Sequence, residues 1–259
     1  MPVARLGNLG QRLTPKGALD LLRQLMLFGG AYYVYRLVRG LVDGHPNVAF
    51  QHARDIVYLE RSLHSFFEVD VQQWALARPF IIHAADWMYV NSHFVVTTAF
   101  LVWLYTARNQ SYYFVRNMFL VAMVFALIGY IAFPAAPPRF LPEWGFQDTV
   151  EDLFGTGASS TASVLYNPYA AIPSMHVAFA LMIAIPAIKL MRHRLTKLLW
   201  ALYPFVVTFV VISTGNHFWL DAAFGVLVAA VSAWIASAAF ARARPDAWAW
   251  RTGPAEAPA

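Results

Sequence analysis

Six long apolar runs constrain the fold of this chain more than any other feature of its sequence. They cover residues 19–42, 80–106, 112–133, 170–188, 198–213 and 217–240. A helix needs about 20 mostly apolar residues to span a membrane, and only helices or closed barrels satisfy their backbone groups in lipid. Because the runs are continuous rather than alternating, the sequence predicts an all-α polytopic membrane protein with about six transmembrane helices in one bundle.

The composition supports a membrane protein and excludes several kinds of chemistry. Hydrophobic residues make up 59% of the chain and charged residues 13%, whereas soluble domains average about 45–50% and about 25%. There is no cysteine, which excludes disulfides and thiolate chemistry. The net charge of +5 is modest. Most basic residues flank apolar runs, so membrane orientation explains them better than nucleic-acid binding does.

The chain divides into one membrane-embedded domain and two polar tails. We expect the domain at residues 19–240, between tails at 1–18 and 241–259. Residues 46–79 mix charges with apolar residues at helical spacing, which predicts helices that lie in the membrane interface. Residues 134–168 are rich in proline, glycine and serine and predict a long loop.

Basic residues between the runs predict the orientation of an integral, multi-pass protein, which we expect in the plasma membrane. With six spans, the side of the N-terminal tail also carries Arg108, Arg116, Lys189, Arg192, Arg194, Lys197, Arg242 and Arg244. Cytoplasmic loops carry an excess of Lys and Arg. Both tails are therefore expected in the cytoplasm and the loop at 134–168 at the outer face, although Arg36, Arg39, Arg54 and Arg61 fall on the outer side and oppose this rule.

Two histidines lie near the starts of the fourth and sixth apolar runs. One span, a basic loop and a second span separate His176 from His217, so both are expected at the outer face. Asp221 follows His217 by four residues, which places the two on one face of a helix. A carboxylate on one ring nitrogen fixes the tautomer and makes the other nitrogen more basic. The alternative is a capped helix start with Asn216 as the cap.

A helix start and an arginine add anion-binding groups at the same face. Pro173 favours the first position of a helix, so the N–H groups of Ser174 and Met175 would lack acceptors and face an anion, with the Ser174 hydroxyl beside them. Arg139 follows a proline-rich turn, and a guanidinium binds phosphate through two oxygens. The alternatives are an ordinary helix start and an arginine that contacts lipid headgroups.

Further polar residues are weaker candidates for a headgroup or acceptor pocket: Asn91, His93, Asp148, Tyr166, Asn167 and Tyr169. Asn91 and His93 also fit hydrogen bonds between helices. Asp148 also fits a solvated loop charge, and residues 166–169 also fit a structural role.

The paired motifs resemble the type 2 phosphatidic acid phosphatase superfamily, the histidine lipid phosphatases and phosphotransferases. The resemblance rests on Pro-Ser-Met-His at 173–176 and His-x-x-x-Asp at 217–221, and it covers about residues 80–240. It implies a six-span helical bundle, no cofactor and no metal.

The resemblance also implies a role for each site residue. His217 would be the nucleophile that forms a phosphohistidine, and Asp221 would orient it. His176 would be the general acid that protonates the leaving oxygen. Arg139 and Ser174 would bind the phosphate.

The chain departs from the phosphatase branch of this superfamily at several positions. Met175 stands where that branch has glycine, Val210 and Val211 replace a Ser-Arg pair, and Ala132 replaces a lysine. Fewer cations suit a phosphodiester, with one charge, better than a phosphomonoester, with about two. The motifs therefore look closer to the inositolphosphotransferase and inositol phosphorylceramide synthase-like branch.

The leading functional prediction is a lipid phosphotransferase, with a phospholipid as donor, a hydroxyl compound as acceptor and the bilayer as its environment. A lipid phosphate phosphatase, with water as acceptor, is the first alternative. A non-enzymatic transporter or lipid-binding membrane protein is the second. The sequence indicates no nucleic-acid partner, and no motif in it defines an oligomeric state.

Overall fold

The computed structural model of the 259-residue chain describes residues 14–41, 46–149, 169–240 and 242. Its helices are α2 (Ala18–Gln24), η1 (Leu25–Gly29), α3 (Gly30–Leu41), α4 (Pro46–Ser62), α5 (Glu68–Leu76), α6 (Pro79–Trp87), η2 (Met88–Ser92), α7 (His93–Ala107), α8 (Asn109–Ala132), η3 (Pro138–Phe140), η4 (Pro142–Trp144), α11 (Met175–Leu190), α12 (Arg194–Ser213), α13 (Trp219–Ile235) and η5 (Ala236–Phe240). No strand occurs among the described residues. The predicted all-α class is confirmed.

Most of each predicted apolar run is helical in the structure. Four helical stretches are long and apolar enough to cross a membrane: Pro79–Ala107, Asn109–Ala132, Arg194–Ser213 and Trp219–Ala239. The apolar helix α11 is shorter, at 16 residues. The first run forms α2, η1 and α3 without a break. Charged residues such as Asp20, Arg23 and Arg39 make it more polar than the four candidate spans. The polytopic membrane fold is confirmed, and a crossing by the first run stays a prediction.

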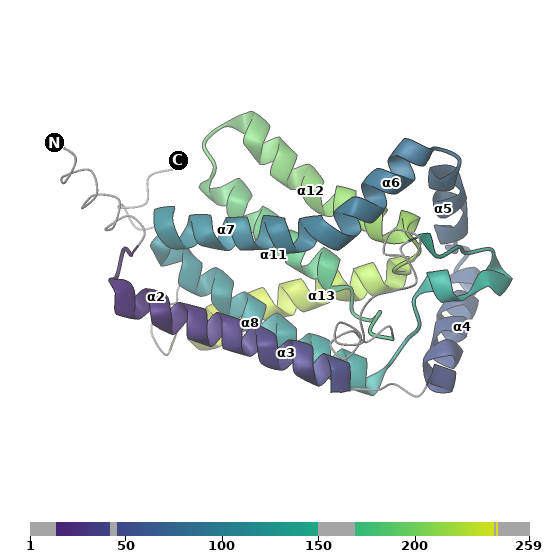
Figure 1. The fold of residues 1–259 in the computed structure, drawn as a ribbon, viewed down its shortest axis with the longest axis horizontal. Coiled ribbons are helices and arrows are strands. Elements are labelled where there is room, and N and C mark those ends of the chain that lie inside the picture. Colours follow the sequence, from purple (N-terminus) through teal and green to yellow (C-terminus); the bar gives the residue numbers. More distant parts are fainter. Residues whose placement is uncertain (1–13, 42–45, 150–168, 241, 243–259) are drawn as a thin grey trace.

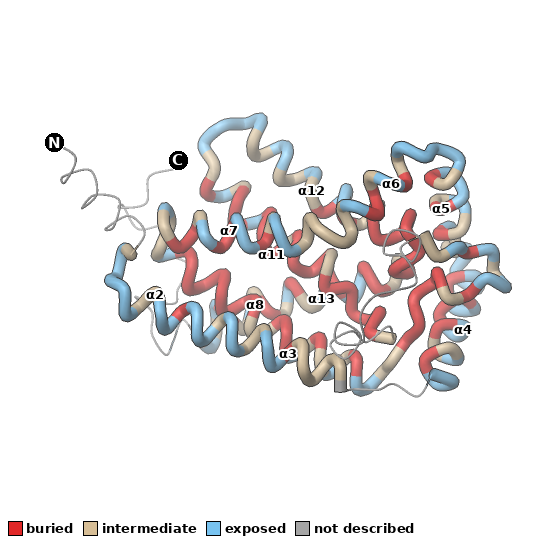
Figure 2. The backbone as a smooth tube through the Cα atoms, in the orientation of Figure 1, coloured by how far each residue is buried: buried red, intermediate tan, exposed pale blue. Residues whose placement is uncertain are grey.

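The long helices form one bundle with α11 at its centre. Figure 1 shows α2, α3, α7, α8, α11, α12 and α13 running between the end of the bundle near α4 and α5 and the opposite end. α11 packs against α12, α13, α8 and α7, and α13 also packs against α8. Figure 2 shows buried residues along α8 and α11 and exposed residues on the outward sides of α2 and α12.

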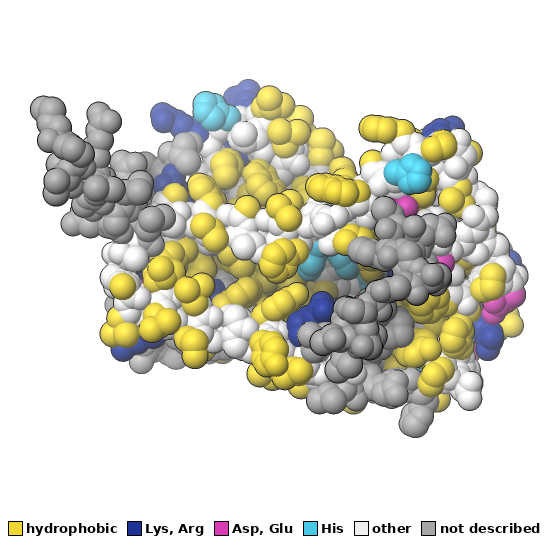
Figure 3. Space-filling model, in the orientation of Figure 1, with side chains coloured by type: hydrophobic (Ala, Val, Ile, Leu, Met, Phe, Trp, Pro, Cys, Tyr) yellow, Lys and Arg dark blue, Asp and Glu magenta, His cyan; other side chains and the backbone are white. Residues whose placement is uncertain are grey.

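The outer surface of the bundle is apolar. Phe94 is 62% exposed, Phe205 74% and Trp234 68%, and yellow apolar side chains cover much of the face in Figure 3. Soluble proteins rarely expose apolar patches of this extent. This surface therefore matches a protein surrounded by lipid.

Helices α4 and α5 lie across one end of the bundle, at a steep angle to its long helices (Figure 1). The buried face of α4 carries Ala49, Ala53, Ile56 and Val57 at helical spacing. It packs against apolar residues of the segment 133–146. A location of α4 and α5 in the membrane interface stays a prediction, and this placement across a bundle end is what it requires.

Arg116 was expected to flank a cytoplasmic loop, and this was wrong. It lies two turns inside α8 and is only 3% exposed. Its guanidinium donates hydrogen bonds to the side-chain oxygens of Asn117 and Gln24. These bonds give the guanidinium donors acceptors and join α8 to α2 within the bundle.

Gly225 allows α13 to approach the start of α11. A Cβ atom at this position would collide with the backbone carbonyl oxygen of Ser174. Backbone atoms cannot move aside as a flexible side chain can. The contact therefore fixes how closely the beginnings of α11 and α13 lie, and both carry candidate site residues.

We expect Gly225→Ala to destabilise the protein, because a side chain forced into a closely packed contact typically costs about 1–3 kcal/mol. Thermal unfolding in detergent micelles measures the effect as a lower midpoint. Gly30→Ala is the matched control, since nothing lies within 4 Å of a Cβ there and alanine favours a helix by about 1 kcal/mol. Equal midpoints for the two variants would contradict the close-contact interpretation.

Candidate active site

His217 lies in the turn between α12 and α13 and is 5% exposed. The expectation that it stands on the helix with Asp221 was wrong, because α13 begins at Trp219. The pair forms nevertheless: Asp221 Oδ2 is 3.2 Å from His217 Nδ1 and accepts the Phe218 N–H at 3.0 Å. A carboxylate in the first helical turn thus reaches back over the helix start. It fixes the ring and leaves Nε2 for chemistry.

The turn that carries His217 is braced by its own polar groups. Thr214 Oγ1 donates to the Val210 carbonyl oxygen at 2.8 Å, and Asn216 Nδ2 donates to Thr214 Oγ1 at 2.8 Å. Asn216 therefore supports the turn and does not cap α13, which removes that alternative. Asp221 is the residue that caps the helix.

Gly215 brings Arg139 against this turn. The Arg139 N–H donates to the Gly215 carbonyl oxygen at 2.7 Å. Gly215 has a φ of +65°, and a Cβ there would lie 2.7 Å from Gln72 Nε2 and 3.2 Å from Arg139 Cβ. Glycine meets both demands, a left-handed backbone and a close approach. The segment after α8 is thereby held beside His217.

Arg139 faces a carboxylate as well as the turn. Its Nε lies 3.2 Å from Asp148 Oδ2, with the two side chains 5% and 20% exposed. Asp148, a candidate for binding acceptor hydroxyls, thus contacts the predicted phosphate-binding cation. The charge of Arg139 is therefore partly offset before any substrate enters.

The start of α11 contributes Ser174 and His176. The helix begins at Met175, one position after Ser174 and two after Pro173. The Ser174 N–H donates to the backbone oxygen of Asp221 at 3.0 Å. The expectation that this N–H faces an anion was therefore wrong, because α13 packs against it. The first N–H groups of α11 itself keep no acceptor within the helix, and the Ser174 side chain, 0% exposed, adds a hydroxyl.

His176 stands between His217 and His93. Ring centroids are 5.8 Å apart for His176 and His217, and 4.5 Å apart for His176 and His93. The His176 ring also stacks on Tyr89 at 4.6 Å and is hydrogen-bonded to the Tyr89 backbone. These contacts hold the His176 ring beside His217.

The π-helix η2 explains how Tyr89 and His93 reach this position. A π-helical turn takes an extra residue and shifts the side chains that follow, and His93 is the first residue after η2. The His93 ring stacks on Phe179 of α11 at 5.0 Å. Asn91 instead donates to the Trp87 carbonyl oxygen on its own helix at 3.0 Å. The structure therefore brings His93, but not the amide of Asn91, to the histidines.

A small cavity adjoins His176. It lies between η2 and α12, and its lining includes Tyr203, Val207, Val210 and Val211. Val210 and Val211, which stand where the phosphatase branch of the resembled superfamily has a Ser-Arg pair, make this wall of the cavity apolar. Figure 3 shows histidine side chains deep in a hollow of the bundle surface, between the apolar surfaces of α7 and α3.

The remaining candidates lie farther from the histidines or outside the description. Tyr166 and Asn167 fall outside the described residues. The Tyr169 ring meets Phe50 edge-on at 6.1 Å, and its carbonyl oxygen accepts the Ala135 N–H at 2.9 Å. These contacts tie Tyr169 to α4 and to the segment after α8.

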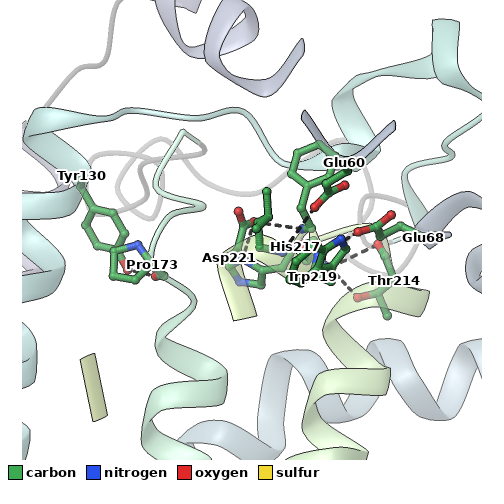
Figure 4. A network of polar contacts seen from close by, with 11 residues as sticks. Glu60, Glu68, Tyr130, Pro173, Thr214, His217, Trp219 and Asp221 are labelled. Atoms are coloured by element: carbon green, nitrogen blue, oxygen red, sulfur yellow. Dashed lines mark hydrogen bonds and ion pairs between the residues drawn. The ribbon is translucent and has the colours of Figure 1, made fainter. Parts of the chain in front are cut away.

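Sequence reasoning missed Glu60 and Glu68 as site residues. Both were read as charges of interfacial helices, yet both are 0% exposed, and Figure 4 shows them pointing toward the start of α13 beside Trp219. Burial raises the pKa of both carboxyl groups. A signal existed for Glu60, because it continues the buried stripe of Ala53, Ile56 and Val57. The exposed charges around Glu68 gave none.

Comparison with known proteins agrees with this geometry. No curated protein and no solved structure gives a significant match. A family model described as the PAP2 superfamily matches residues 54–235. The matched range is well over half of the chain, includes His176, His217 and Asp221, and begins in α4, earlier than the motifs alone indicated. The chain therefore belongs to the PAP2 superfamily, whose members are typically phosphatases or phosphotransferases, and its general activity is of this kind on lipid phosphates.

Proposed function

We propose that this protein is a membrane lipid phosphotransferase that moves a phosphorylated headgroup from a phospholipid to an acceptor hydroxyl through a phosphohistidine on His217. The observation that carries the proposal is the His217–Asp221 contact of 3.2 Å with the His176 ring centroid 5.8 Å away. Such a transfer requires a nucleophile oriented by a carboxylate and a nearby proton donor for the leaving oxygen.

In the first step, Nε2 of His217 attacks the phosphorus of a phosphodiester. The Nε2–P bond forms while the bond from phosphorus to the leaving oxygen breaks, and protonated His176 gives that oxygen its proton. The phosphorylated ring gains positive charge, which the buried Asp221 carboxylate stabilises. Arg139 and the start of α11 contact the other phosphate oxygens, where charge spreads in the transition state.

In the second step, the acceptor hydroxyl attacks the same phosphorus. Neutral His176 takes the hydroxyl proton as the new P–O bond forms and the Nε2–P bond breaks. His217 and His176 return to their starting states. The two steps need no group beyond the donor, the acceptor and the side chains named.

The charges around the site support a phosphodiester substrate over a phosphomonoester. Arg139 lies 3.2 Å from the Asp148 carboxylate, so part of its charge is already offset. Val210 and Val211 are 5% and 0% exposed and offer no donor. A singly charged diester needs less compensation than a monoester with about two charges.

A phosphatase that uses water as acceptor is the second candidate. The family match favours it as much as a transferase, and the chemistry differs only in the second step. The acceptor in that step decides between the two.

We further propose that the site faces the outer side of the membrane. Arg108, Arg192, Arg194 and Lys197 lie at or near the α7–α8 and α11–α12 junctions, which Figure 1 draws at the bundle end opposite α4 and α5. Cytoplasmic ends carry the excess of basic residues. This distribution supports a cytoplasmic position for that end.

We expect His217→Ala to abolish transfer and His176→Ala to slow it about 10²–10⁴-fold, the usual contribution of general acid–base catalysis. Turnover of a headgroup-labelled phospholipid in micelles measures both. His193→Ala, exposed between α11 and α12, is the matched control and should keep full activity. More than a few per cent of activity in His217→Ala would refute the nucleophile.

Added acceptors distinguish transferase from phosphatase. With a polyol or a lipid alcohol present, the labelled headgroup phosphate should appear on the acceptor, because the phosphohistidine is intercepted by the hydroxyl. Thin-layer chromatography with mass spectrometry identifies the products. If only the hydrolysed phosphate compound appears at every acceptor concentration, the enzyme is a phosphatase.

Chelators should leave the rate unchanged, since the proposed steps use only histidine, carboxylate and guanidinium groups. Turnover after treatment with EDTA and dialysis measures this. A rate that falls with EDTA and returns with added magnesium or zinc would contradict the scheme.

A further inference from the structure

Three consecutive backbone N–H groups at the start of α13 each meet a different carboxylate. The Phe218 N–H donates to Asp221 at 3.0 Å, as described above. The Trp219 N–H donates to Glu68 Oε1 at 2.8 Å, and the Leu220 N–H donates to Glu60 Oε1 at 3.3 Å. Helix starts leave these N–H groups without acceptors. Here two of the acceptors come from α4 and α5, which are far away in sequence.

The two glutamates differ in their surroundings. Both oxygens of Glu68 accept backbone donors, because Oε2 also accepts the Phe67 N–H at 3.0 Å. No backbone N–H of the described residues meets the buried Glu60 Oε2, and the carboxyl groups of Glu60 and Glu68 share a side-chain hydrogen bond. The geometry thus fits an ionised Glu68 and a protonated Glu60.

The charged groups around Glu60 agree with this assignment. Burial is the main reason that the pKa of its carboxyl lies far above the usual range, and the charges of Glu68 and Asp221 raise it further. Two carboxylates that share a buried site cannot both ionise easily. The pair then carries one negative charge, directed at the positive end of α13.

We propose that Glu68 is a positioning residue of the active site, which holds the first turn of α13 and thereby keeps His217 and Asp221 in place against the phosphorus. The inference rests on the proposed role of His217 as nucleophile. Neither glutamate touches the reacting atoms. Glu68 acts through the backbone N–H of Trp219, two residues after His217.

Catalysis is sensitive to this kind of support. A displacement of about 1 Å at a reacting group can cost about 10²-fold in rate. Hydrogen bonds to ionised acceptors are roughly twice as strong as neutral ones, so Glu68 should contribute more than Glu60. Because α4 and α5 lie across the bundle end, they can brace α13 from outside the span.

The test compares two substitutions of the same shape, Glu60→Gln and Glu68→Gln. The amide of Glu60→Gln keeps an acceptor for Leu220 and replaces the acid O–H with N–H, so kcat should stay within about twofold. Glu68→Gln removes the charge. Because both oxygens of Glu68 accept backbone N–H groups, the amide must also turn its NH₂ toward one of these donors. Its kcat should fall at least about tenfold with KM unchanged, since Arg139 and α11 still bind the phosphate.

Hydrogen–deuterium exchange followed by mass spectrometry measures how well the first turn of α13 is protected in the absence of substrate. The peptide that contains Trp219 and Leu220 should exchange at least about tenfold faster in Glu68→Gln and at the wild-type rate in Glu60→Gln, while α8 peptides stay unchanged. If Glu68→Gln does not accumulate, Glu68→Asp keeps the charge but shortens the side chain, and should give the same loss of protection and kcat.

The outcomes separate this inference from the proposed function. A wild-type kcat and wild-type exchange in Glu68→Gln, with His217→Ala inactive, would overturn the positioning role alone. Equal defects in both glutamine variants would show a common packing role and also overturn it. If His217→Ala stays active, the proposed function fails, and the exchange measurement still decides whether Glu68 holds α13.

Discussion

The site depends on how the beginning of α13 is satisfied. A helix that starts inside a membrane protein exposes N–H groups that neither lipid nor its own turn can accept. Here Asp221, Glu68 and Glu60 accept those of Phe218, Trp219 and Leu220. Asp221 serves twice, because the same oxygen lies 3.2 Å from His217 Nδ1. The solution to a problem of folding thus also fixes the ring of the proposed nucleophile.

The other parts of the site are joined to this helix start by backbone contacts. Ser174 donates its N–H to the Asp221 carbonyl oxygen, and Arg139 donates its N–H to that of Gly215. Gly225 and Gly215 have no Cβ, so these segments can come close. The segment after α8, the start of α11 and the start of α13 therefore meet with little dependence on flexible side chains. Rigid support of this kind suits a reaction that needs a fixed distance between His217 and His176.

The long apolar runs predicted the helices well because spanning lipid imposes a length and composition on each of them. The pairing of His217 with Asp221 was also predictable, since their separation and their place at the start of an apolar run are visible in the sequence. The start of α13 was not, because Asp221 caps the helix from within its first turn and leaves His217 outside.

What the sequence could not reveal are contacts between segments distant along the chain. Glu60 and Glu68 look like surface charges of amphipathic helices, and only the packing of α4 and α5 across the bundle end buries them. The contact of Asp148 with Arg139, and that of Ser174 with Asp221, likewise depend on tertiary structure. For His93, the π-helical turn of η2 sets the direction of the ring, and no simple periodicity encodes such a turn.

The distribution of charge links this architecture to the choice of substrate. Asp221, Glu68 and Asp148 place carboxylates on or near the His217 turn, and Arg139 is already opposite one of them. A phosphomonoester would bring about two further negative charges to these groups, whereas a phosphodiester brings one. In the proposed reaction, attack by neutral His217 would make its ring positive, and the Asp221 carboxylate would stabilise that charge. The carboxylates would therefore disfavour a doubly charged ground state and favour the proposed phosphorylated imidazolium, which is the balance expected of the proposed transfer of a diester headgroup.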